Sequence, residues 1–267
     1  MVRRTVHDGE RVNDREGVRT PCRKATLVND VMVRAAKDSS TDHEGAHAMK
    51  TKTLLQAGVV AGPVFISVVG AQLLTRDGFD VMHQPISLLS LGEAGWVQIA
   101  NFIVAGLLCC AFAAGLSRVL TTGPGSTWGS RLIALFGVGL VAGGVFTPDP
   151  ALGWPAGTPD AIPQSFTWHA MIHAAAPPLA FTALVLAALV MARRFRAAGG
   201  RGWALCSAVS GLVALIITAW PDQGTASWRL VIGVVVGFAW LTAFAVHERA
   251  SHLRSHGAKA VAEGVPT

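Results

Sequence analysis

The sequence predicts an all-α membrane protein in which six transmembrane helices form one compact bundle. Of the 267 residues, 51% are hydrophobic and only 14% are charged, whereas roughly a quarter of the residues of a soluble protein are charged. Six apolar runs approach the length of about 20 residues that a helix needs to cross a bilayer. None of these runs alternates apolar with polar residues, which disfavours a β-barrel and leaves helices to satisfy the backbone in lipid.

The first 52 residues are polar, rich in arginine and lysine, and without a hydrophobic period. Such a segment buries too little apolar surface to offset its ordering entropy, so we expect a disordered basic tail over residues 1–52. Its charged stretch is too long for a secretory signal. Met49 directly precedes Lys50 and the first apolar run. This favours a translation start at Met49 rather than Met1, with the preceding residues an extension of the gene model.

The transmembrane domain is predicted over residues 53–248, with a cytoplasmic tail over 249–267. Its apolar runs cover residues 54–74, 96–116, 128–147, 169–192, 203–220 and 228–246. Small residues recur at four-residue spacing in the first, third and sixth runs: Gly58 and Gly62, Gly139 and Gly143, Gly233 and Gly237. This spacing predicts that neighbouring helices of the same chain approach closely at these positions.

The loop charges predict that both termini are cytoplasmic. The loop after the fourth run carries four arginines, whereas the segment between the third and fourth runs has no lysine or arginine. Because cytoplasmic loops carry the excess of positive charge, the arginine-rich loops are placed inside. The same placement explains the formal net charge of +6 without nucleic-acid binding, which we do not expect. Membrane lipid is the expected partner, and the four cysteines are expected to serve packing.

The strongest candidate for chemistry is the start of the fourth run, where His169 and His173 stand four residues apart. In a helix this spacing places both imidazoles on one face. Pro177 and Pro178 follow, and each removes a backbone hydrogen bond inside the helix. The backbone carbonyls that they free, those of His173 and Ala174, must then face protein or a polar cavity.

One interpretation of these residues is a metal site on the outer side of the membrane. His169 and His173 supply two imidazoles, His83 a third and Asp149 a carboxylate. Three protein ligands and an open position are typical of catalytic zinc, and these ligand types suit zinc before iron or manganese. Two further acids, Asp80 and Asp222, are candidates to orient an imidazole or to accept the proton.

The alternative is that these residues are polar side chains at a wet membrane interface, because a single pair of histidines at this spacing is a weak motif. Three functions therefore stay open. In the first, the chain binds or moves a lipid or small amphiphile in an outward-facing polar pocket. In the second, it is a metal-dependent hydrolase. In the third, it is a structural or partner-binding membrane protein. Whether it is an enzyme is not decided by the sequence.

The pattern resembles the six-helix bacterial membrane family called domain of unknown function 998. The residues that carry the resemblance are Asp80, His83–Ser87, Gly95–Gln98, Asn101, Phe102, Gly106, Gly143–Asp149, His169 and His173. The resemblance covers residues 54–248 and implies the fold and a place in the bacterial cytoplasmic membrane, but no activity. A looser similarity is to the alkaline ceramidase and progestin-receptor-like membrane hydrolases. These have seven helices and a zinc held by His and Asp, so the number of helices differs here.

Overall fold

The computed structural model describes residues 20–219 and 226–262, and it divides the chain into two compact units at residues 1–48 and 49–267. The helices are α1 (Thr20–Thr75), η1 (Ile86–Ser90), α2 (Gly95–Val119), α3 (Trp128–Val145), α4 (Trp168–Ala197), α5 (Arg201–Ala219) and α6 (Ala226–Ala262). Within the described residues there is no β-strand, and six helical segments are long and apolar enough to cross a membrane. The predicted six-helix membrane fold is confirmed.

The first helix begins earlier than the first apolar run. The structure places residues 20–52, which the sequence predicts as part of an irregular tail, in α1. Pro21 stands in the first turn, where a missing backbone N–H costs nothing, and no further proline occurs before Pro63. The apolar segment that can cross a membrane begins at Ala48.

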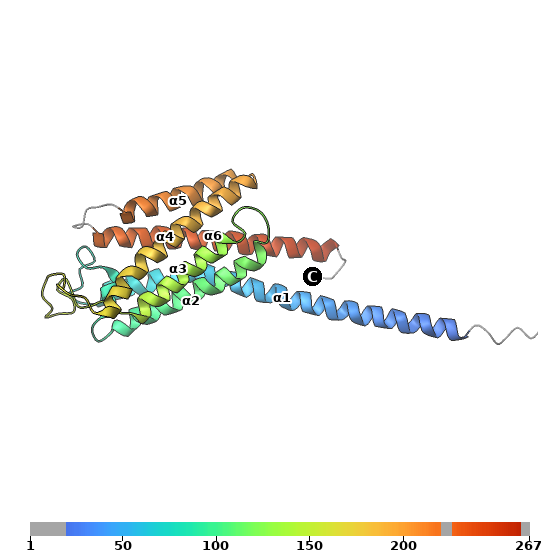
Figure 1. Ribbon diagram of the computed structural model, residues 1–267. Coiled ribbons are helices and arrows are strands. Elements are labelled where there is room, and N and C mark those ends of the chain that lie inside the picture. Colours follow the sequence, from blue (N-terminus) through green and yellow to red (C-terminus); the bar gives the residue numbers. More distant parts are fainter. Residues whose placement is uncertain (1–19, 220–225, 263–267) are drawn as a thin grey trace, which may run out of the picture. The chain divides into compact units, whose positions relative to one another are not determined.

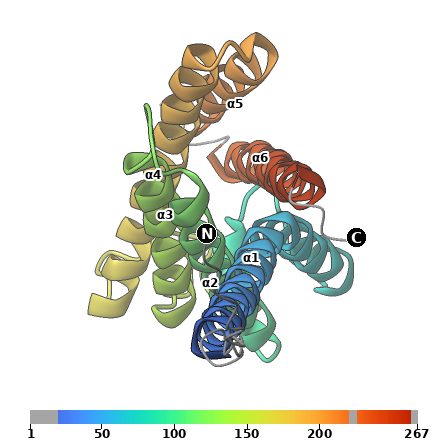
Figure 2. The same cartoon turned by 90° about the vertical axis from the view of Figure 1, so that its right-hand side faces the viewer.

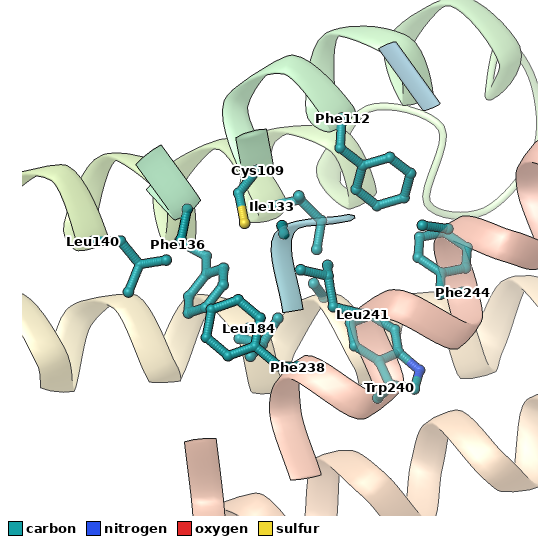
Figure 3. Close-up of a cluster of buried hydrophobic side chains, with 14 of the residues drawn as sticks. Cys109, Phe112, Ile133, Phe136, Leu140, Leu184, Phe238, Trp240, Leu241 and Phe244 are labelled. Atoms are coloured by element: carbon teal, nitrogen blue, oxygen red, sulfur yellow. The ribbon is translucent and has the colours of Figure 1, made fainter. Parts of the chain in front are cut away.

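Consecutive helices of the second unit pack against one another from α2 to α6 (Figures 1 and 2). The membrane part of α1 contacts both α2 and α6, because Gly58 faces Phe112 of α2 and Gly62 faces Phe238 and Thr242 of α6. Phe238 lies at the centre of the bundle. Its ring stacks on Phe65 of α1 at 4.9 Å and meets Phe136 of α3 at 5.5 Å. Figure 3 shows these side chains of α3 and α6 within one apolar cluster.

Glycines allow two of the helices to approach closely. A Cβ atom on Gly106 of α2 would meet the carbonyl oxygen of Gly137 at 2.5 Å, and one on Gly137 would meet the carbonyl oxygen of Gly106 at 2.6 Å. Of the six glycines predicted to serve close packing, five face another helix of the chain, and Gly143 has open space around its Cβ position. The small-residue pattern therefore marks helix packing within the chain, as predicted.

Two long segments form one layer at an end of the bundle, and we call residues 76–94 and 146–167 the loop layer. Gln84 donates from Nε2 to the carbonyl oxygen of Leu152 at 2.8 Å. Arg76 lies over the ring of Trp154, which meets Phe79 edge-on at 5.1 Å. Pro85 is followed by the short 3₁₀ helix η1. At the opposite end, Arg194 donates to the carbonyl oxygens of Thr122 and Pro124.

Candidate functional site

The two histidines predicted to carry chemistry lie in the first turns of α4. Thr167 is the N-cap residue of this helix, and its hydroxyl accepts a hydrogen bond from the backbone N–H of Ala170. The helix continues through Pro177 and Pro178 to Ala197. His169 is half-buried, whereas only 5% of His173 is exposed. The pair therefore faces protein, as expected for polar side chains in a membrane helix.

Both imidazoles are held by the C-terminal end of α3. His173 donates from Nδ1 to the carbonyl oxygens of Phe146 at 2.7 Å and Gly143 at 3.1 Å. His169 donates from Nδ1 to the carbonyl oxygen of Thr147 at 3.0 Å. The last carbonyls of a helix have no partner within it. His169 and His173 therefore donate hydrogen bonds to carbonyl oxygens at the end of α3 and attach α4 to it. We call this pair of histidines the clasp.

Asp149 is engaged by the residue that begins α4. Its carboxylate accepts one hydrogen bond from the Thr167 hydroxyl at 2.7 Å and one from the Thr167 backbone N–H at 2.8 Å. The side-chain hydrogen bond, followed by the backbone hydrogen bond, lowers the pKa of Asp149 below its ordinary value of 3.8, so the group is ionised at neutral pH. The negative charge of Asp149 lies near the start of α4, where the positive end of the helix dipole also stabilises it.

The remaining candidates lie in the loop layer. His83 is paired through Nε2 with Asp160 at 2.7 Å, and half of its side chain is exposed. Asp80 shapes the turn that follows it, because its carboxylate accepts from the backbone N–H of Met82 at 2.9 Å. Asp222 lies outside the residues that the structure describes. Asp160, which is paired with His83, and Thr167, which donates to Asp149, were not predicted as site residues from the sequence. Thr167 could have been found, because a threonine directly before Trp168 is a recognisable N-cap signal.

Of the proposed metal ligands, the structure brings Asp149 and His169 to the same Thr167 hydroxyl, at 2.7 Å and 3.2 Å. In the described part of the chain, no group of three His, Cys, Asp or Glu side chains is placed to hold one ion. Asp149 accepts hydrogen bonds from Thr167, and Nε2 of His83 is paired with Asp160. The two α4 histidines donate from Nδ1 to backbone carbonyls, which leaves only Nε2 of each ring as a possible ligand atom. The zinc site stays a prediction, and this geometry gives it no support.

A cavity of about 530 Å³ opens beside α4, and we call it the α4 cavity. One stripe of α4 forms a wall, with lining residues recurring every three or four positions from Ala170 and His173 to Val185. This stripe extends about 22 Å along the helix at 1.5 Å per residue. The other walls come from η1 and the loop layer, from the last turn of α5 and from Leu230 of α6.

Polar and apolar groups are separated along the α4 cavity. Asp149 and Ser87 lie on its loop-layer side, and the wall formed by α4 and α5 is mostly apolar, including Phe181, Val185 and Leu215. His173 also lines a second, smaller cavity of about 70 Å³ between α3, α4 and α6. The freed carbonyls of His173 and Ala174 belong to residues of the α4 cavity wall.

A family model described as "Protein of unknown function (DUF998)" matches residues 59–247, which begin within α1 and end within α6. The match thus reaches all six helices that are apolar enough to cross a membrane. No curated protein and no solved structure matches the chain.

Proposed function

The chain belongs to this family of proteins of unknown function, DUF998, and we propose that it binds a lipid or small amphiphile in the α4 cavity. The observation that supports this proposal is the cavity itself. Its volume of about 530 Å³ lies in the range of roughly 300–1,000 Å³ that is usual for small-molecule sites. Such sites are mostly apolar with a few placed polar groups, which describes this lining.

The extent of the cavity suits a molecule that has a head group and a chain. The stripe on α4 is about 22 Å long, and one leaflet is half of a hydrocarbon core about 30 Å thick. An acyl chain that lies in the cavity could therefore extend through one leaflet. The polar residues at the loop layer would meet the head group at the interface. The distribution of arginine supports an outward-facing loop layer, because segment 146–167 carries no lysine or arginine and segment 76–94 carries Arg76 alone.

Lipid retention tests the proposal. The chain is purified from membranes in a mild detergent, and the amphiphiles that remain bound are extracted and quantified per chain by mass spectrometry. Ala174→Phe places a ring in the α4 cavity, whereas Ala175→Phe makes the same change one residue later, at an exposed position that does not line it. We expect about one retained molecule per chain, with a roughly tenfold loss in Ala174→Phe only.

The result that would overturn the proposal is equal retention by the two phenylalanine variants, because occupancy would then not depend on the α4 cavity. Circular dichroism and the elution volume of both variants serve as controls that the helices and the particle size are preserved.

A further inference from the structure

We infer that the molecule held in the α4 cavity has a neutral head group with a free hydroxyl, and that Nε2 of His173 accepts the hydrogen bond from this hydroxyl. The inference rests on the proposed function, and it names the chemical class of the ligand and the residue that selects it. A lipid alcohol such as a diacylglycerol has this chemistry, whereas a phospholipid with an anionic head group does not.

The hydrogen bonds of the ring determine its protonation at each nitrogen. Both partners of Nδ1 are backbone carbonyl oxygens, those of Gly143 and Phe146, and a carbonyl oxygen can only accept. Nδ1 therefore carries the hydrogen. In the neutral imidazole the other nitrogen, Nε2, then has a lone pair and no hydrogen, so it is an acceptor.

This acceptor is buried without a partner. Nε2 of His173 is enclosed and has no hydrogen-bond partner among the described residues, and only 5% of the residue is exposed. A buried polar atom without a partner is costly, and native proteins leave few of them. His173 lines both the α4 cavity and the smaller cavity beside it. Because Nε2 itself is enclosed, a ligand supplies the missing donor only where the side chains that cover Nε2 move aside.

The charge of the lining selects against an anionic head group. Asp149 is the charged residue among the described residues of the α4 cavity wall, and none of them is lysine or arginine. Its pKa is lowered by the hydrogen bonds from Thr167, so the carboxylate keeps its negative charge at neutral pH. A phosphate in the same cavity would meet this charge and find no cation.

The same lining argues for a hydroxyl rather than an ammonium group. The distinction depends on the burial of Nε2 and not on Asp149, whose carboxylate oxygens each accept one hydrogen bond from Thr167 and keep a second lone pair. An ammonium beside Nε2 would have to lose its water next to a residue that is 5% exposed, which costs far more than the transfer of a neutral hydroxyl that finds an acceptor.

Three probes separate these chemistries on the unchanged protein. The purified full chain in phosphatidylcholine nanodiscs is titrated with dioleoylglycerol, with its methyl ether, and with dioleoylphosphatidic acid, and bound lipid is measured by native mass spectrometry. The ether keeps the shape and loses the donor. We expect dioleoylglycerol to bind roughly tenfold more tightly than its ether, because the ether leaves Nε2 unpaired. Phosphatidic acid should bind more weakly than dioleoylglycerol.

Two matched variants assign the effect to His173. In His173→Asn, the amide nitrogen takes the place of Nδ1 and can still donate to α3, but the acceptor at the Nε2 position is lost. His169→Asn makes the same change one turn earlier, where the imidazole also donates from Nδ1 but lines neither cavity. We expect the preference for the alcohol over the ether to fall to about one in His173→Asn and to persist in His169→Asn.

The outcomes distinguish this inference from the proposed function. If dioleoylglycerol and its ether bind equally, or if phosphatidic acid binds more tightly, the inference is overturned while amphiphile binding stands. If none of the three probes binds and Ala174→Phe changes nothing, both are overturned. A preference for the alcohol that survives in His173→Asn would show that another group accepts the hydrogen bond and would also overturn the inference.

Discussion

The imidazole of His173 on α4 donates from Nδ1 to the carbonyl oxygen of Phe146, at 2.7 Å, and so connects the start of α4 to the C-cap residue of α3. His169 repeats this contact one turn earlier with Thr147. The two helices are thereby held together at the loop layer, beside the α4 cavity.

Loss of this clasp should weaken the bundle. We expect His173→Ala to lower the free energy of unfolding by about 1–2 kcal/mol, because the change leaves carbonyls of α3 without a donor. His173→Asn should retain most of the stability, since its amide can donate to the same carbonyls. Unfolding in mixed micelles with increasing denaturing detergent measures the difference, and Met171→Ala at an exposed position of α4 is the control. Equal losses in the Ala and Asn variants would contradict the clasp.

Asp149 should make stability depend on pH in the acid range. Its pKa is lowered in the folded chain by the hydrogen bonds from Thr167, so its contribution is present above the ordinary value of 3.8 and is lost as pH falls through the lower folded value. The stability difference between the unchanged chain and Asp149→Asn should therefore be constant from about pH 5 to 7 and shrink below about pH 4.

Thr167→Val tests the cause of this shift. Without the hydroxyl, the pKa of Asp149 should rise toward its ordinary value, and the loss of stability in acid should become smaller. Carboxyl resonances of ¹³C-labelled aspartate, followed by NMR between pH 2 and 7, report the pKa directly. An unchanged titration in Thr167→Val would show that the hydroxyl does not set it.

The contact between Gly106 and Gly137 should tolerate no side chain. A Cβ on Gly106 would meet the backbone oxygen of Gly137 at 2.5 Å, so Gly106→Ala must push α2 and α3 apart and should cost about 1–3 kcal/mol. Gly70→Ala on α1 is the matched control, because nothing lies within 4 Å of its Cβ position. This change should be neutral or stabilise by up to about 1 kcal/mol. The same detergent unfolding assay compares the two, and equal effects would contradict the packing argument.

The arginine distribution predicts that the loop layer faces outward. In a chain without its native cysteines, Ala156→Cys in the loop layer should react in intact cells with a maleimide that does not cross the membrane. Ala198→Cys, between α4 and α5, should react only after the cells are opened. Both positions are exposed, so accessibility within the fold is matched. The reverse pattern of labelling would place both termini outside.

Metal analysis tests the zinc hypothesis. We expect the chain, purified with zinc and then dialysed, to hold well below one zinc ion per molecule, because no three candidate ligands among the described residues are placed to hold one ion. Zinc at one ion per chain, lost in the double variant His169→Ala and His173→Ala, would contradict this expectation and support the metal-dependent hydrolase.

The sequence by itself determined the class of fold. Residues 54–74 and the five later apolar runs are long enough to cross a bilayer, and in lipid each must satisfy its own backbone hydrogen bonds, so each becomes a helix whatever its neighbours are. The close approach of glycines such as Gly62 could also be predicted, because their four-residue spacing is visible in the sequence.

Only the tertiary structure decided what the polar residues do. The spacing of His169 and His173 shows that both imidazoles share a face of a helix, but not whether the groups opposite them are metal ligands or the carbonyls of Thr147 and Phe146. That choice depends on how far α3 extends before it ends and on which helices pack beside α4. Long-range packing sets both, and it also creates the cavity that leaves Nε2 of His173 without a protein partner.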